Sequence, residues 1–337
     1  MGRLEGKSMK PSVLISRAVF PEVIERLREH FDVETNDTDT VWPQAEFIQR
    51  LQGKAGVFMT GTGSIDAALL AACPGLRAVC SMAVGYNNID VAACTARKVL
   101  VSNAPDVLTE TTADFGFALM MASARRITES EHFLRRGEWK QWSVDMFAGA
   151  DVHGATLGVL GMGRIGQAIA KRGALGFGMK VIYHNRSHLD AATEAALGAR
   201  YVSKEALLRE ADHLVIVVPY SAASHHLIGA AELALMKPGA TLTNIARGGI
   251  VDDAALAQAL RDKRIAAAGL DVFEGEPAVH PDLLTVPNVV LTPHIASASL
   301  PTRRAMAHLA ADNLIAALGF GPNKGRPPTA LNPEVLA

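Results

Sequence analysis

The stretch ATLGVLGMGRIGQAIAKRG, residues 155–173, decides the fold of this chain. It opens on a short apolar run with the length of a buried strand and closes on a helical segment. Between them, Gly161, Gly163 and Gly166 form the pattern G-x-G-x-x-G. In such a strand-to-helix turn, backbone N–H groups and the positive end of the helix can meet a pyrophosphate. The stretch therefore predicts a dinucleotide-binding unit, with a tight turn that binds nothing as the alternative.

Short apolar runs alternate with helical segments on both sides of this stretch. Strands buried on both faces of a parallel sheet carry such runs, so we expect an α/β fold with two doubly wound, Rossmann-like domains. The last helical segment is expected to return to the first domain and make it discontinuous. The predicted parts are a flexible tail (1–8), a first domain (9–107 and 299–337) and a dinucleotide-binding domain (108–298).

The charges of the chain are balanced, with 33 basic and 34 acidic side chains. No net field would draw it onto nucleic acid or a membrane, whereas small ligands need only local charge. No run approaches the roughly 20 uninterrupted apolar residues of a membrane span, and the N-terminus lacks the apolar core of a signal peptide. Cys73, Cys80 and Cys94 have no metal-ligand spacing, so we expect buried hydrophobes in a reducing cytoplasm.

No metal site is expected. His225 and His226 are adjacent in the sequence, and we expect adjacent side chains to point in different directions. Patterns typical of zinc sites, such as H-E-x-x-H or paired cysteines, do not occur.

Residues 111–142 contain no proline and are predicted to form one long helix. Its first half, from Phe115 to Ala124, is apolar on every side, which a surface helix of a monomer would not tolerate. The segment is therefore expected to pack between domains or subunits and to form a homodimer. Trp139 and Trp142 could reach the substrate mouth of the partner or could simply cap the helix.

The end of the second strand of the dinucleotide unit indicates which cofactor binds. About 20 residues after the last glycine, an Asp or Glu usually holds the ribose 2′-hydroxyl of NAD. Here Arg186 stands at that position, flanked by Asn185 and Ser187. A forked cation with neutral donors suits a 2′-phosphate, so the loop predicts NADP(H). A solvated turn that happens to hold an Arg remains the alternative, because Asp190 lies close by.

Three polar residues follow predicted strands of the same domain: Arg247 in TNIARGGIVD, Glu276 in GLDVFEGEP and His294 in LTPHIASAS. Open α/β sheets hold their ligands at the carboxyl ends of the strands. Together the three offer a cation to grip a carboxylate, an imidazole to donate a proton and a carboxylate to keep that imidazole charged. This combination predicts a carbonyl reductase.

The motifs GMGRIG, NIARGGIVD, GLDVFEGEP and TPHIASA, in this order, resemble the D-isomer-specific 2-hydroxyacid dehydrogenases. The resemblance extends from Met9 to the end of the chain. VGYNNID, GEWKQW and DVHGATLGVLGMGRIG are similar to the branch of glyoxylate/hydroxypyruvate and 2-ketogluconate reductases, which typically use NADPH. The resemblance implies a flavodoxin-like substrate-binding first domain and an active site in the cleft between the domains. It implies NADPH-dependent reduction of a small 2-keto acid to the D-2-hydroxy acid.

The resemblance also assigns roles to single residues. Arg247 matches the arginine that pairs with the substrate carboxylate and the C2 oxygen, Glu276 the acid that hydrogen-bonds the imidazole, and His294 the proton donor. Backbone amides near Val84 and Gly85 match those that receive the carboxylate. The cofactor contacts implied are Thr112, Gly161, Gly163, Arg164, Ile165, Gly166, Asn185, Arg186, Ser187, Val218, Pro219, Ile245, Asp271 and Ser297. The segments PYSAASHHLIG and SASLPTRR depart from the family pattern on the adenosine side and at the hinge.

Two other functions stay open at this point. One is an NAD-dependent D-2-hydroxyacid dehydrogenase for another class of substrate, and the other is a non-catalytic protein that senses dinucleotides. A sensor would have less need of Arg247, Glu276 and His294 together, which favours an enzyme. The sequence does not rank glyoxylate, hydroxypyruvate and 2-keto-D-gluconate as substrates.

Overall fold

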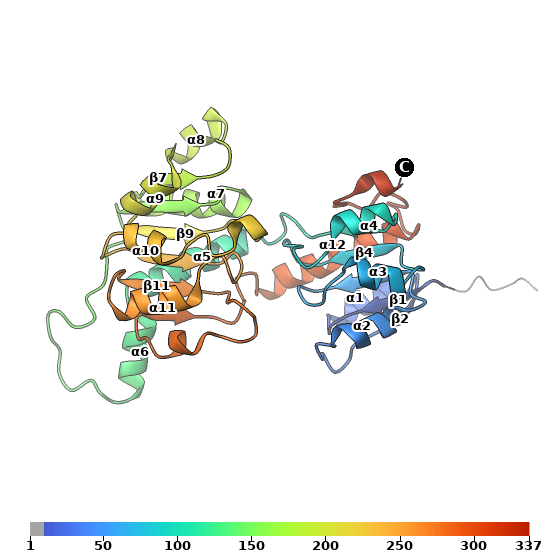
Figure 1. The fold of residues 1–337 in the computed structure, drawn as a ribbon, viewed down its shortest axis with the longest axis horizontal. Coiled ribbons are helices and arrows are strands. Elements are labelled where there is room, and N and C mark those ends of the chain that lie inside the picture. The colour runs from blue at the N-terminus through green and yellow to red at the C-terminus, as the bar shows by residue number, and fades with distance from the viewer. Residues whose placement is uncertain (1–9, 337) are drawn as a thin grey trace, which may run out of the picture. The chain divides into compact units, whose positions relative to one another are not determined.

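The computed structural model describes residues 10–336, so the expected tail of residues 1–8 lies outside the described residues. The chain divides into two compact units (Figure 1). Unit 1 comprises Met1–Leu108 and Ser299–Ala337, and unit 2 comprises Thr109–Ala298. Each unit contains one sheet of parallel strands, which confirms the predicted α/β fold with two Rossmann-like sheets.

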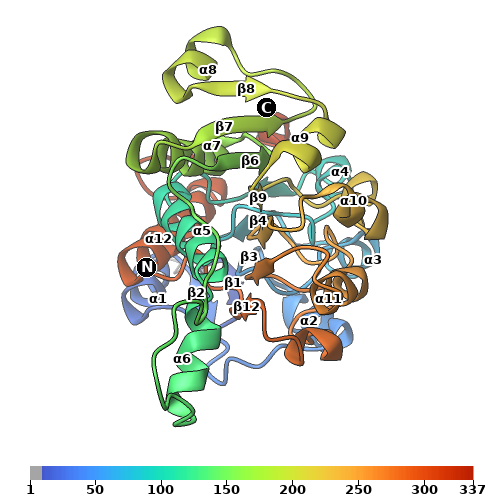
Figure 2. The same cartoon turned by 90° about the vertical axis from the view of Figure 1, so that its left-hand side faces the viewer.

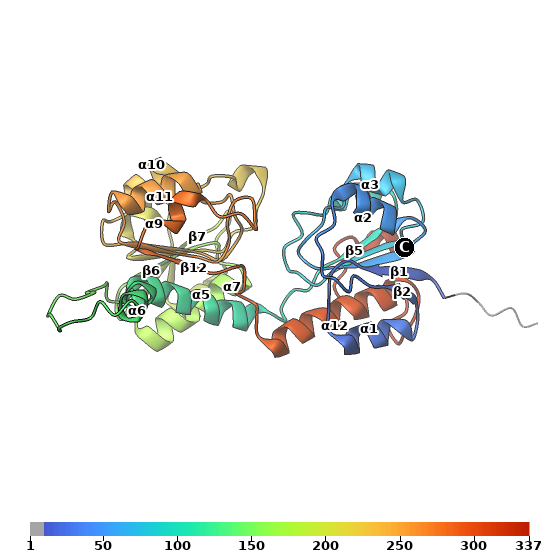
Figure 3. The ribbon, with the colours of Figure 1, turned by 90° about the horizontal axis from the view of Figure 1, so that it is seen from below.

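Unit 1 holds a five-stranded sheet in the order β2-β1-β3-β4-β5. Helices α1 and α12 cover one face and α2 and α3 the other (Figure 3). Gly56 lets α12 approach, because a Cβ there would lie 2.7 Å from Cδ1 of Leu314. The elements are β1 (Ser12–Ile15), α1 (Pro21–Arg28), β2 (Asp32–Glu34), α2 (Gln44–Leu51), β3 (Gly56–Met59), α3 (Ala67–Ala72), β4 (Ala78–Ser81), α4 (Val91–Ala96), β5 (Leu100–Ser102), α12 (Leu300–Ala317) and the short η4 (Pro333–Leu336).

Unit 2 holds a seven-stranded sheet in the order β12-β11-β10-β9-β6-β7-β8. Helices α5 and α7 pack on one face, and α9, α10 and α11 pack on the other (Figure 3), so two hydrophobic cores enclose the sheet. The elements are α5 (Thr109–Ala124), α6 (Ile127–Arg135), β6 (Thr156–Leu160), α7 (Arg164–Lys171), η1 (Arg172–Gly176), β7 (Lys180–His184), α8 (Ala191–Leu197), β8 (Ala199–Tyr201), α9 (Lys204–Glu210), β9 (His213–Ile216), η2 (Ala222–Ser224), α10 (Ala230–Leu235), β10 (Thr241–Asn244), α11 (Asp253–Arg261), β11 (Ala267–Leu270), η3 (Pro281–Leu284) and β12 (Val289–Leu291).

The single helix predicted over 111–142 is wrong. The helix breaks after Ala124, Arg126 takes a left-handed backbone conformation with φ 53°, and residues 136–150 form turns and loop. The helix breaks there because the loop that follows α6 folds back onto the end of α5. The N–H of Ala150 donates to the carbonyl of Ala124 at 2.9 Å. Gly149 fits there since a Cβ would lie 2.2 Å from that carbonyl oxygen.

The apolar helix α5 is covered mainly by its own unit, which removes the reason given for a dimer interface on it. Its neighbours are α7 and the strands β10 and β11, and Phe117 packs on Phe177 with ring centroids 4.8 Å apart. Helix α6 instead extends beyond the sheet (Figure 2), and every residue of it is exposed or half-buried. The unpaired apolar surface of this region therefore lies on α6 and on the loop that follows it.

The three cysteines are free and buried, as predicted. Burial raises the pKa of Cys80 to about 12 and that of Cys94 to about 11, so both thiols stay protonated near neutral pH. Across residues 10–336, none of the helices combines the length and the apolar character that crossing a membrane requires.

Candidate active site

The polar residues predicted in unit 2 meet at one edge of its sheet. Arg247, Glu276 and His294 follow β10, β11 and β12, which are neighbours in the sheet. Because all these strands are parallel, the loops after them emerge at the same edge. The glycine loop follows β6 and therefore opens at this edge as well.

His294 and Glu276 form a close pair. Nδ1 of His294 lies 2.7 Å from Oε2 of Glu276, and Oε1 accepts a hydrogen bond from the N–H of Phe273 at 2.9 Å. Burial alone would raise the pKa of Glu276, but the hydrogen bonds and the charges of His294 and Arg247 outweigh burial and lower it. An ionised carboxylate at Nδ1 fixes the tautomer and directs Nε2 away from the pair.

The loop that carries His294 is anchored by Asp271. The carboxylate of Asp271 accepts hydrogen bonds from the N–H groups of Ile295 and Ala296, both at 2.8 Å, and from Oγ1 of Thr292 at 2.7 Å. Asp271 is fully buried, and burial raises its pKa against the effect of these bonds. His294 stands inside this clamp with a left-handed φ of 54°. Asp271, predicted as a cofactor contact, uses both carboxylate oxygens to hold the loop that carries His294, a role that its sequence position did not reveal.

Arg247 is half-buried on the loop after β10. Its Nη1 donates to the carbonyl of Ala246 at 2.7 Å, and Nδ2 of Asn244 donates to the carbonyl of Arg247 at 3.1 Å. Burial lowers the pKa of Arg247, and the charge of Glu276 opposes that shift. The loop that carries Arg247 contacts the loop that leads to Glu276 at Gly248. A Cβ at Gly248 would lie 1.7 Å from the carbonyl oxygen of Phe273.

The glycine loop has the geometry that a dinucleotide requires. Gly161 has φ 102°, and a Cβ there would lie 2.8 Å from the backbone of Val217 and Val218. A Cβ at Gly166 would lie 2.2 Å from the carbonyl oxygen of Gly161, whereas Gly163, the N-cap of α7, faces open space. Glycine at 161 and 166 therefore allows the tight turn. Glycine at 163 leaves the space at the positive N-terminal end of α7 open to a ligand.

Thr112 and Asn185 add two observations on the cofactor site. Oγ1 of Thr112 is buried and has no hydrogen-bond partner among residues 10–336, as a hydroxyl awaiting a ligand would be. Oδ1 of Asn185 accepts a hydrogen bond from the N–H of Met162 at 2.6 Å, so this residue ties the end of β7 to the glycine loop. Arg186 and Ser187 lie exposed beside it. These residues fit a bound nicotinamide dinucleotide.

The remaining predicted cofactor contacts divide between the glycine loop and the ends of other strands. Arg164 and Ile165 begin α7, Val218 and Pro219 follow β9, and Ile245 follows β10. The last predicted contact, Ser297, follows the His294 loop just before unit 2 ends.

Val84 and Gly85 belong to unit 1, in the loop after β4. Nδ2 of Asn103 donates to the carbonyl of Val84 at 2.7 Å, and the N–H of Ala104 donates to the carbonyl of Ala83 at 3.0 Å. The chain after β5 therefore holds this loop in place.

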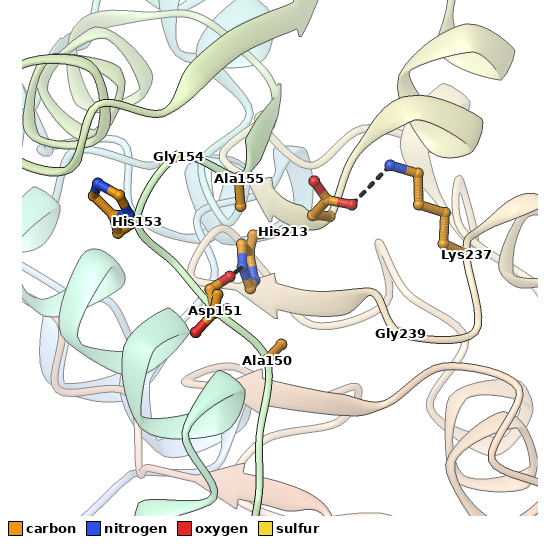
Figure 4. Close-up of a pocket in the computed structure, with 9 residues that line it drawn as sticks. Ala150, Asp151, His153, Gly154, Ala155, His213, Lys237 and Gly239 are labelled. Atoms are coloured by element: carbon orange, nitrogen blue, oxygen red, sulfur yellow. Dashed lines mark hydrogen bonds and ion pairs between the residues drawn. The ribbon is translucent and has the colours of Figure 1, made fainter.

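A pocket of about 460 Å³ lies at the opposite edge of the unit 2 sheet, among the starts of β6, β9 and β10 (Figure 4). His213 on its wall is fully buried, with Nδ1 2.9 Å from Oγ1 of Thr241 and Nε2 3.0 Å from the carbonyl of Asp151. Lys237 pairs with Asp212 at 2.7 Å. These polar groups bind one another and hold the strand starts together, so we assign the pocket no part in the reaction.

The expectation that His225 and His226 diverge is wrong. Their rings stack, with centroids 3.9 Å apart and planes 21° apart, because His226 has a left-handed φ of 49°. Within residues 10–336, one group of ligand-type side chains is placed so that it could hold a metal ion, and it consists of these two histidines and Glu274.

Comparisons with known proteins agree with this geometry. A family model for the NAD binding domain of D-isomer specific 2-hydroxyacid dehydrogenases matches residues 117–296, which include Arg247, Glu276 and His294. The chain is 45% identical over 332 residues to a glyoxylate reductase of Thermococcus gammatolerans, covering 97% of this chain and 98% of that one. It is 46% identical over 333 residues to a glyoxylate reductase of Aeropyrum pernix, covering 97% of each.

A solved structure matches equally widely. The NADPH-dependent glyoxylate/hydroxypyruvate reductase of Sinorhizobium meliloti, crystallised with NADP and malonate, superimposes with a TM-score of 0.84 at 35% identity. The match covers 96% of this chain and 97% of that one. Both units therefore have counterparts in that enzyme.

Proposed function

Because this chain belongs to the D-isomer specific 2-hydroxyacid dehydrogenase family, we propose that it uses NADPH to reduce a small 2-keto acid such as glyoxylate or hydroxypyruvate. The observation that carries the proposal is the 2.7 Å pair of His294 and Glu276 at the same sheet edge as Arg247. A protein that only senses dinucleotides needs the glycine loop but has no use for a charge-paired imidazole.

Each catalytic residue has one task in this proposal. Arg247 binds the substrate carboxylate and the C2 oxygen. The bound nicotinamide supplies the hydride that adds to C2. As the C–H bond forms, the electron pair of the C=O bond moves onto oxygen, and His294 gives its proton to that oxygen. The product is the D-2-hydroxy acid.

Electrostatics favour this proton transfer. The lowered pKa of Glu276 keeps its carboxylate ionised, so that it can accept a hydrogen bond from Nδ1 of His294 and hold the ring for proton transfer from Nε2. Arg247 is half-buried, so its charge acts on the developing alkoxide with less screening than it would have in open water. Because the negative charge on the oxygen grows only as the reaction proceeds, the charge of Arg247 stabilises the transition state more than the ground state.

The choice of NADPH over NADH rests on Arg186. Arg186 and Ser187 are exposed at the end of β7, where a 2′-phosphate would need cationic and neutral donors. Asp190 does not compete, since its carboxylate caps α8 by accepting from the N–H and Oγ1 of Thr193 at 2.9 and 2.6 Å. The Sinorhizobium meliloti relative, crystallised with NADP, gives the same choice independent support.

The proposed homodimer uses α6 and the loop 136–150. Large apolar side chains are exposed there, among them Leu134 at 57%, Trp142 at 73% and Val144 at 86%. Such a patch is typical of an interface. Light scattering should therefore give about twice the chain mass of 35.7 kDa at micromolar concentration. Trp142→Ser should shift the distribution toward monomer, and a parent protein that stays monomeric would contradict the proposal.

The reaction is tested by following the loss of reduced nicotinamide with glyoxylate, hydroxypyruvate and 2-keto-D-gluconate, each with NADPH and with NADH. We expect turnover with NADPH, a D product on chiral chromatography, and a rate about 10² to 10⁴ lower for His294→Ala. If the parent binds NADPH but reduces none of the three acids, the proposal of a reductase for this class of substrate fails.

A further inference from the structure

We propose that His225, His226 and Glu274 form a site for a divalent transition-metal ion of the zinc type on the surface of unit 2. One ligand atom from each side chain lies within 4.8 Å of the other two, which is close enough for a single ion to contact all three. None of the three takes part in the proposed reduction, so the metal site does not depend on that function.

The backbone positions the two histidines before any ion arrives. The N–H of His226 donates to the carbonyl of Gly249 at 2.7 Å, and the N–H of Ile228 donates to the carbonyl of Ile250 at 3.1 Å. The N–H of Asp252 donates to the carbonyl of Ile228 at 3.0 Å. This short parallel ladder holds His226 in the left-handed conformation that brings both rings to one side.

The surroundings of the rings resemble those of metal-bound histidines. Nε2 of His226 lies 2.8 Å from Oε2 of Glu274, and its Nδ1 lies 3.8 Å from Oδ2 of Asp252. Histidine ligands commonly have a carboxylate at the ring nitrogen that does not bind the metal, which fixes the ring and raises its basicity. Asp252 is placed for that role, with Nε2 and Glu274 facing the ion.

Hydrogen bonds also position His225 and Glu274. The hydroxyl of Tyr220 lies 3.2 Å from Nδ1 of His225, and the N–H of Glu274 donates to Oδ2 of Asp253 at 3.1 Å. Gly249 makes room, because a Cβ there would lie 3.2 Å from Cε2 of Tyr220 and 3.4 Å from Nδ1 of His225.

The ligand set selects the class of ion. Two imidazoles and one carboxylate suit Zn²⁺, Ni²⁺ or Cu²⁺, whereas Mg²⁺ and Ca²⁺ prefer oxygen ligands alone. Three protein ligands leave a position for water. An ordinary exposed ion pair would explain the contact of His226 with Glu274, but it does not account for His225, whose ring offers a third ligand atom within 4.8 Å of the other two.

The site is tested on the full chain after dialysis against a chelator, by calorimetric titration with ZnCl₂ and by the visible absorption of added Co²⁺. We expect one equivalent of Zn²⁺ and a Co²⁺ spectrum with nitrogen ligands. Asp252→Asn should weaken binding about 10- to 100-fold, and His226→Gln and Glu274→Gln at least as much, since they remove direct ligands. MgCl₂ should give no saturable heat.

His153→Gln is the matched control, because His153 is also exposed but lies at the pocket on the opposite sheet edge. It should leave Zn²⁺ binding unchanged. All the substituted side chains reach solvent, and circular dichroism checks that each variant is folded. Absence of stoichiometric Zn²⁺ binding by the parent, or equal affinity in the parent and both ligand variants, would overturn the proposal.

Discussion

Replacing Glu276 by Gln removes the negative charge of the His294–Glu276 pair with little change in the shape of the side chain. The side chain keeps its size and can still accept the hydrogen bond from the N–H of Phe273. It loses the negative charge that lies 2.7 Å from Nδ1 of His294. Because the pKa of Glu276 is lowered in the folded protein, this charge is present at neutral pH and disappears only as the pH falls through that lowered value.

The expected effect follows from the difference between two kinds of hydrogen bond. A bond to a charged group contributes about 1.5–3 kcal/mol and a neutral one about 0.5–1.5, so the substitution should weaken the contact that holds the His294 ring by about 1–2 kcal/mol. Near neutrality, kcat/KM should fall about 5- to 30-fold.

The assay is the pH dependence of kcat/KM with NADPH and hydroxypyruvate, measured for the parent, Glu276→Gln and His294→Ala. His294→Ala should lose about 10² to 10⁴ at every pH, because it removes the proton donor itself. If Glu276→Gln keeps the kcat/KM of the parent near neutrality, the charge of the carboxylate does not act through the imidazole and the reasoning is refuted.

Arg186→Asp should weaken NADPH binding by about 1.5–3 kcal/mol and leave NADH binding unchanged. Equal losses of affinity for both cofactors would show that Arg186 does not contact the 2′-phosphate. Asp212→Asn should lower the free energy of unfolding by under about 1 kcal/mol at pH 7, because this carboxylate is 38% exposed. Burial would raise the pKa of Asp212, but hydrogen bonds, including that from Lys237, lower it overall. That stability is therefore present above the unfolded value of about 3.9 and is lost as pH falls through the lowered folded value, so denaturant titrations of parent and variant should converge in acid. A thiol reagent at pH 8 should not label Cys80 or Cys94, whose pKa values are about 12 and 11, until denaturant is added; rapid labelling of the folded chain would contradict their burial.

The sequence was sufficient to predict the sheets and the common sheet edge of Arg247, Glu276 and His294 for one physical reason. Arg247, Glu276 and His294 each follow a buried apolar run, and parallel strands bring such positions to one edge. The prediction needed no knowledge of side-chain contacts. The distance between His294 and Glu276, by contrast, depends on loop conformations that apolar patterning does not determine.

Two errors arose where backbone conformation depends on distant residues. The helix predicted over 111–142 breaks because Ala150 bonds the carbonyl of Ala124, a contact that periodicity along one segment does not reveal. Likewise, adjacent side chains diverge in extended backbone, but His226 adopts a left-handed conformation that a non-glycine residue rarely takes. Hydrogen bonds to the segment around Gly249 impose it, so no local pattern predicts it.

The loop after β11 connects Arg247, Glu276 and His294 to one another. It begins with Asp271, whose buried carboxylate holds the His294 loop, and it continues to Phe273, whose carbonyl packs on Gly248 beside Arg247. The N–H of Phe273 then orients Glu276. Since β11 lies between β10 and β12, one loop from the middle strand can contact both neighbouring loops. We therefore expect changes at Asp271 to displace His294 and changes at Gly248 to displace Arg247.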